Sequence, residues 1–114
     1  MRTFLSGLAI AILAHAETAQ ADTVETFMNG NSLLAYCQGD APDRSECLGY
    51  IEGVADDWET VRHVRGLSPC TGPDVTAGQV KDVVVNWLIA NPAHRHETAA
   101  GLVVFAITNA WHCR

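Results

Sequence analysis

The chain has 114 residues, of which 48% are hydrophobic and 18% charged, and its formal net charge is −6 at pH 7. This length is enough for one small domain with a modest core. Because the balance of charge is acidic, we expect no nucleic-acid partner and no binding to an anionic membrane surface.

The first 21 residues, MRTFLSGLAIAILAHAETAQA, have the layout of a secretory signal peptide. Arg2 precedes an apolar run over 4–14, and two small-x-small cleavage sites follow at 14–16 and 19–21. The alternative is an uncleaved anchor, but the apolar run is shorter than the roughly 20 residues of a membrane-spanning helix. We therefore predict a signal peptide over 1–21 and one exported domain over 22–114, with no membrane association after cleavage.

Two helices are predicted in the first half of this domain. The first covers about 32–38, and Asn31 is its expected N-cap. The second covers about 44–65. Asp43 and Glu46, three residues apart, resemble a capping box at its start.

The third predicted helix covers about 77–90. Thr76 and Gln79 form a capping box before it, and the Asn91-Pro92 pair stops it. The run of three valines inside it suits a strand, but the capped ends and the apolar spacing favour a helix.

The fourth predicted helix covers about 96–111, where apolar residues recur with a period near 3.6. Four helices joined by short connections indicate an all-α domain made of two helical hairpins. The apolar positions of the fourth helix are Ala99, Leu102, Val103, Ala106, Ile107 and Ala110.

The chain has four cysteines, Cys37, Cys47, Cys70 and Cys113. An even number in a small exported domain indicates two disulfides, with three alternative pairings. A zinc site is the rival interpretation, but no C-x-x-C spacing occurs. Each helical hairpin brings the region before one helix near the end of its neighbour, which favours the pairs Cys37–Cys47 and Cys70–Cys113.

The second predicted helix has two faces that look buried. One side carries a bulky apolar stripe, and the opposite side carries Gly49, Gly53, Asp56 and Thr60. Because each interior glycine costs roughly 1 kcal/mol relative to alanine, a backbone is expected to approach this face closely. That backbone belongs either to another helix of the same chain or to a second copy or partner. The bulky stripe comprises Cys47, Ile51, Val54, Trp58 and Val61.

The segment 61–75, which spans the end of this helix and the loop after it, is the most basic part of the chain. We predict a binding loop here, with Gly66 terminating the helix and a cysteine anchoring the loop base. The alternative is a plain connection between helices. The candidate partner-binding residues are Arg62, His63, Arg65, Leu67 and Ser68.

The sequence offers little for catalysis. It has no P-loop, no nucleophile elbow and no H-E-x-x-H motif. His94 and His96 form an H-x-H pair, but residues two apart do not face each other on a helix. We therefore expect no enzyme activity, no metal site and no cofactor.

Four segments, taken in order, resemble the Rap/Tai immunity proteins. These are NGNSLLAYC, CLGYIEGVADDW, CTGPDVTAGQVKDVVVNWLIANP and HETAAGLVVFAI, followed by a final cysteine. The ending AWHC departs from the apolar-Pro-Cys ending typical of that family. Positions that match the family pattern are the four cysteines with Gly49, Tyr50, Gly53 and Asp56.

This resemblance implies an all-helical, disulfide-bonded periplasmic protein, commonly a homodimer. It also implies that the partner is a peptidoglycan amidase effector of type VI secretion, inhibited by occlusion of its catalytic cleft. The alternative function is a small helical periplasmic chaperone or stress protein, which would share the size, the disulfides and the export signal.

Overall fold

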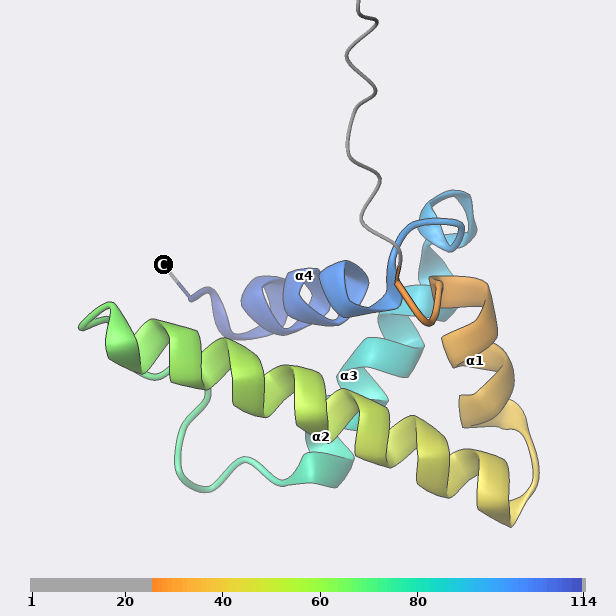
Figure 1. Cartoon of the computed structure of the whole chain (residues 1–114), viewed down its shortest axis with the longest axis horizontal. Helices are drawn as coiled ribbons and strands as arrows, with labels where there is room; N and C mark the ends of the chain where they lie inside the picture. The colour runs from red at the N-terminus through yellow and green to blue at the C-terminus, as the bar shows by residue number, and fades with distance from the viewer. Residues whose placement is uncertain (1–25, 114) are drawn as a thin grey trace, which may run out of the picture.

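The computed structural model describes residues 26–113, where the chain forms four α-helices and one short 3-10 helix (Figure 1). The elements are α1 (Gly30–Gln38), α2 (Ala41–Val64), α3 (Ala77–Ala90), η1 (Pro92–His94) and α4 (Ala99–Trp111). Helix α1 pairs with α2 and α3 pairs with α4, so the predicted all-α architecture of two hairpins is confirmed. The predicted signal peptide, 1–21, lies outside the described residues.

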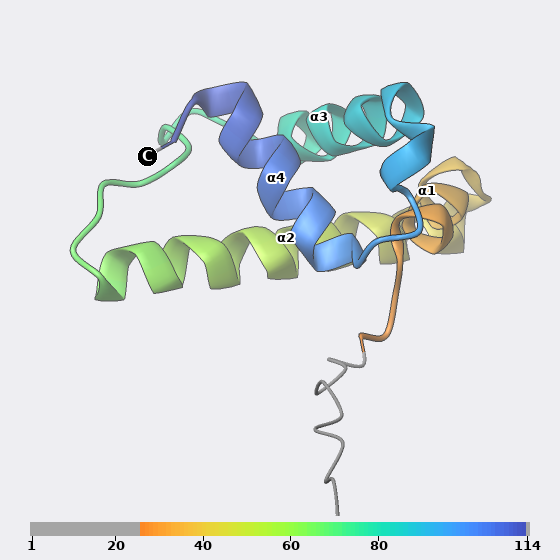
Figure 2. The same ribbon diagram turned by 90° about the horizontal axis from the view of Figure 1, so that it is seen from above.

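Helix α2 runs along the length of the molecule, and α3 and α4 lie together on one side of it (Figure 2). The apolar stripes of all four helices meet between them and form one core. No helix among residues 26–113 is both long and apolar enough to cross a membrane. The largest fully buried side chains are Leu33, Cys47, Ile51, Val84, Leu88, Val103 and Ile107.

Helix α1 begins earlier than the sequence suggests. Its N-cap is Asn29 rather than the predicted Asn31, and the Asn29 Oδ1 accepts a hydrogen bond from the Ser32 amide at 2.9 Å. The first helical residue, Gly30, is buried.

Helix α2 also begins earlier than predicted. Asp40 is the N-cap, and its carboxylate accepts a hydrogen bond from the Asp43 amide at 3.2 Å. The predicted capping box of Asp43 and Glu46 is therefore wrong. Pro42 lies in the first turn, where a missing N–H costs nothing.

Helix α3 matches its prediction, including both hydrogen bonds of the Thr76–Gln79 capping box. Helix α4 begins at Ala99 instead of residue 96. The carbonyls of Arg95 and Glu97 accept hydrogen bonds from the Asn31 and Gly30 amides at 2.8 and 3.0 Å. The amides at the start of α1 have no acceptor within their own helix, so they bind the carbonyls of Arg95 and Glu97. If α4 began at residue 96, those carbonyls would instead accept amides of α4.

Both disulfides have the pairing that the hairpin geometry favours. Cys37 is bonded to Cys47 and Cys70 to Cys113, with a Cα–Cα distance of 5.0 Å in each pair. The zinc alternative is excluded, because each sulfur is bonded to another sulfur.

Candidate functional site

The chain reverses sharply at the end of α2 and then projects as an exposed loop. Gly66 has a φ of 71°, in the left-handed region that glycine adopts without steric cost. Its amide donates to the His63 carbonyl and the Leu67 amide to the Arg62 carbonyl, both at 2.9 Å. This pair of hydrogen bonds is a Schellman motif, so the predicted role of Gly66 as helix terminator is confirmed.

The tip of this loop, residues 65–69, is exposed throughout. Leu67 keeps 44% of its surface accessible, although its side chain is apolar. His63 is exposed beside the tip, in the last turn of α2. The structure therefore brings four of the predicted partner-binding residues to one end of the molecule, where α4 also ends (Figure 1): His63, Arg65, Leu67 and Ser68.

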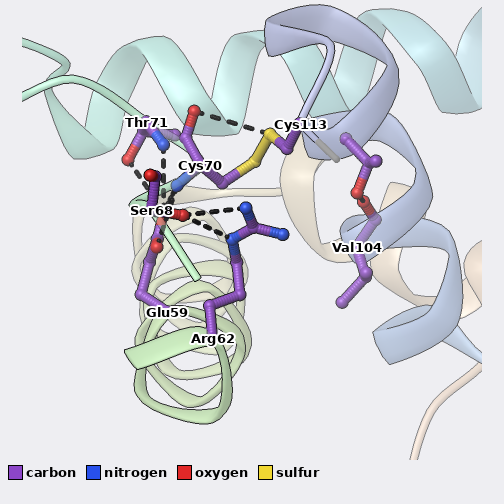
Figure 3. The surroundings of a disulfide bond; sticks show 8 residues. Glu59, Arg62, Ser68, Cys70, Thr71, Val104 and Cys113 are labelled. Carbon is purple, nitrogen blue, oxygen red and sulfur yellow. Dashed lines mark hydrogen bonds between the residues drawn. A yellow bond between two sulfur atoms is a disulfide. The ribbon is translucent and has the colours of Figure 1, made fainter. Parts of the chain in front are cut away.

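Arg62 does not belong to this exposed group. Its side chain is buried, at 5% exposure, and its Nε and Nη2 donate to the Ser68 carbonyl at 3.0 and 2.8 Å (Figure 3). The guanidinium also lies 5.7 Å from the centre of the Trp58 ring. The structure thus gives Arg62 a role within its own chain, where it holds the loop, and contact of Arg62 with a partner stays a prediction.

Glu59 holds the other side of the loop. Its carboxylate accepts hydrogen bonds from the Cys70 and Thr71 amides at 3.0 Å and from the Thr71 hydroxyl at 3.3 Å (Figure 3). The Cys70–Cys113 disulfide ties the same point to the end of α4. The tip thus lies between the end of α2 and the Cys70–Thr71 base. That base is held by the disulfide and by the hydrogen bonds to Glu59.

Sequence reasoning missed Glu59 and the inward role of Arg62. A usable signal was present: an acidic and a basic residue three apart on one helical face, in the turns that precede a cysteine-anchored loop. Side chains at such positions can reach back to satisfy the backbone of the loop that follows.

A second surface is an open groove of about 590 Å³ between α2 and α4. Gly49 and Gly53 line it from α2, and small residues Ala100 and Gly101 line it from α4. A Cβ atom added at Gly49 or at Gly53 would meet nothing within 4 Å. The expectation that a helix of the same chain packs on these glycines is therefore wrong, because α4 leaves the groove open beside them.

Asp56 does not share the surface of the two glycines. It is exposed and lines a separate, smaller hollow between α2 and α3, with Glu52 and Glu59. The close-packing role predicted for Asp56 is therefore not supported. Contact of the glycine groove with a second copy or a partner stays a prediction.

Tyr50 forms part of the wall of the groove. Burial raises the pKa of the Tyr50 phenol above its ordinary value, and a backbone hydrogen bond with Ala100 opposes this shift. A tyrosine hydroxyl is neutral at physiological pH even without this shift, so Tyr50 adds no charge to the groove, whereas Asp57 on the same wall is an acidic residue.

Substitutions at Gly53 test whether the groove is open in the monomer and whether a second copy of the chain occupies it. Gly53→Ala is expected to stabilise the monomer by about 0.5–1 kcal/mol, because alanine favours helix and meets no atom of this chain. The measurement is urea unfolding at low protein concentration. Gly53→Leu should leave the monomer folded and abolish any self-association through the groove, as read by sedimentation. Loss of the monomer fold in either variant would contradict this description of the groove.

Within residues 26–113 no three His, Cys, Asp or Glu side chains are grouped to hold a metal ion. His94, one member of the H-x-H pair, has its Nδ1 2.7 Å from the Glu97 Oε1.

Comparison with known proteins agrees with this architecture. The family model of the Rap1a immunity proteins matches residues 29–113, which is nearly all of the described chain. No curated protein and no solved structure gives a match. The match confirms the resemblance to the Rap/Tai immunity proteins, and the chain belongs to the Rap1a immunity protein family.

Proposed function

We propose that this chain is a periplasmic immunity protein that inhibits a peptidoglycan amidase effector of type VI secretion by inserting its 65–69 loop into the catalytic cleft. Family membership supports a role in immunity and the binding of an effector. The observation that carries the proposal is the exposed tip at Leu67, held by Arg62, Glu59 and the Cys70–Cys113 disulfide.

A loop held in this way is suited to enter a narrow cleft. Because its base is already ordered, docking costs little further conformational entropy. Leu67 supplies an apolar side chain that a cleft can desolvate, which is typical of residues that dominate binding energy. His63 and Arg65 flank it and would compete for groups that receive the anionic peptide stem of the substrate. Charges at such a rim act mainly on association rate and specificity.

Two features support export to the periplasm. Both disulfides require an oxidising compartment to form and persist. The signal-peptide pattern over 1–21 provides the route out of the cytoplasm.

The test is Leu67→Asp, which should weaken inhibition by roughly 30-fold, equivalent to about 2 kcal/mol. A carboxylate at the tip must be desolvated in the cleft, whereas it stays hydrated in the free protein. Arg65→Ala should weaken inhibition only a few-fold, mainly through the association rate. The measurements are inhibition of purified type VI amidase effectors and survival of cells that make the effector in their periplasm.

Ile89→Asp is the matched control, because Ile89 is an apolar residue of similar exposure on α3. This variant should inhibit like wild type, and Leu67→Asp should melt close to the wild-type temperature. If Leu67→Asp protects cells as well as wild type does, the loop is not the inhibitory element, and the contact lies on the helices instead, with the groove between α2 and α4 as the next surface to test.

A further inference from the structure

A second hollow, of about 380 Å³, lies where α3 ends, η1 turns and α4 begins. Three rings line it, those of Trp87, His94 and Phe105, together with Glu97 and Asn91. This corner lies at the opposite end of the molecule from the 65–69 loop, as both views show (Figures 1 and 2). The loop proposal makes no use of it.

The three rings form a connected aromatic wall. The Trp87 ring centre lies 5.4 Å from that of Phe105, with the planes at 60°, and 6.0 Å from that of His94, with the planes at 43°. Asn91 fixes the position of Trp87 in the helix end, because its Nδ2 donates to the Trp87 carbonyl at 2.8 Å. Phe105 is 56% exposed, which is unusual for an aromatic side chain without a polar group.

Glu97 adds a negative charge at the rim of this wall. Its Oε1 lies 2.7 Å from the His94 Nδ1, a contact that orients the carboxylate and the ring together. The carboxylate has a second oxygen, Oε2, that can accept from a ligand. Both side chains are about half exposed, so a ligand reaches them from solvent. The neighbouring basic residue, Arg95, is absent from the lining.

We propose that this hollow receives the cationic end of an arginine or lysine side chain from a partner protein. Aromatic ring faces attract ammonium and guanidinium groups, and the Glu97 carboxylate can form a charge-assisted hydrogen bond with them. The formal charge of −6 attracts cations and repels anionic ligands. The hollow is thus a docking point separate from the 65–69 loop.

The test uses the side chains themselves as probes. N-acetyl-arginine N-methylamide and its lysine counterpart are titrated into the full domain, and the Trp87 indole and Phe105 amide signals are followed by NMR. We expect saturable shifts at millimolar concentration. The neutral analogues, with citrulline in place of arginine and norleucine in place of lysine, should bind at least fivefold more weakly, because they keep nearly the same shape but lack the charge.

Two variants locate the binding. Glu97→Gln keeps the shape of the carboxylate and should weaken arginine binding at least fivefold, and Phe105→Leu should weaken it similarly without opening the core. Glu46→Gln removes the same charge from an exposed position on α2 and should leave binding unchanged. Leu67→Asp should also leave it unchanged, so failure of the loop proposal and failure of this one give different results. Equal affinity for citrulline, or wild-type affinity in Glu97→Gln, would overturn the proposal.

Discussion

Gly30→Ala is expected to lower the free energy of unfolding by about 3 kcal/mol, at the upper end of the usual cost of overpacking a core. A Cβ at this position would lie 2.5 Å from the Leu102 Cδ1 and 2.9 Å from the Arg95 carbonyl oxygen. The leucine can change its rotamer, but that carbonyl accepts the Asn31 amide and is held in place. The measurement is urea unfolding followed by circular dichroism.

Gly49→Ala is the matched control, because it separates the effect of crowding at Gly30 from the effect of helix propensity. Both substitutions replace a helical glycine with the best helix former, so propensity alone predicts stabilisation in both. Gly49 has open space around it, and its alanine variant should gain about 0.5–1 kcal/mol. If Gly30→Ala also gains stability, the close approach of α1 to the corner before α4 does not exist in solution.

Removing the Cys70–Cys113 disulfide by a double alanine substitution is expected to cost about 4 kcal/mol, from the entropy of closing a chain of 43 residues. The Cys37–Cys47 disulfide closes only 10 residues, and its loss should cost about 3 kcal/mol. In a domain of this size either loss is a large share of the total stability. Urea unfolding of the two double variants measures the difference.

The two disulfides should differ more strongly in their effect on inhibition. Cys70 anchors the base of the loop, whereas Cys37 and Cys47 lie at the junction of α1 and α2. Under conditions where both variants remain folded, loss of the Cys70–Cys113 pair should weaken amidase inhibition severalfold, because the tip must then be ordered on binding. Equal inhibition by the two variants would show that Glu59 and Arg62 hold the loop without the disulfide.

Helix positions were predictable from local signals, but helix starts were less so. The capping box identified the start of α3, whereas the local caps Asn29 of α1 and Asp40 of α2 were overlooked. The Thr76–Gln79 capping box uses residues three apart, and α3 begins where it predicts. The start of α4 depends on amides of α1 that are more than sixty residues away in the chain. No local pattern contains that information, so the predicted start was three residues early.

The same distinction applies to the functional surfaces. The exposed tip at Leu67 was predictable, because a helix-terminating glycine and a disulfide cysteine bracket it. The spacing of Glu59 and Arg62 indicates side chains that can reach back to the loop, but the particular carbonyl that Arg62 binds is positioned by tertiary structure. A helical wheel placed Gly49 and Gly53 on one face, but whether a face is covered depends on where α4 crosses α2. The glycine that a neighbouring backbone does approach, Gly30, stood outside the helix predicted for that region.

The bond between Cys70 and Cys113 also sets an order of events during biosynthesis. A chain exported from its N-terminus brings Cys37 and Cys47 almost together into the oxidising compartment, and they can pair before the later residues arrive there. The loop at 65–69 and Cys70 at its base emerge long before Cys113. The disulfide partner of Cys70 is therefore added 43 residues later. A nascent or truncated chain that ends between these two cysteines would carry the whole tip without its tether. Under the proposed function, inhibition would reach its full strength only after Cys113 has been added and bonded, so a fragment that lacks it would inhibit severalfold more weakly.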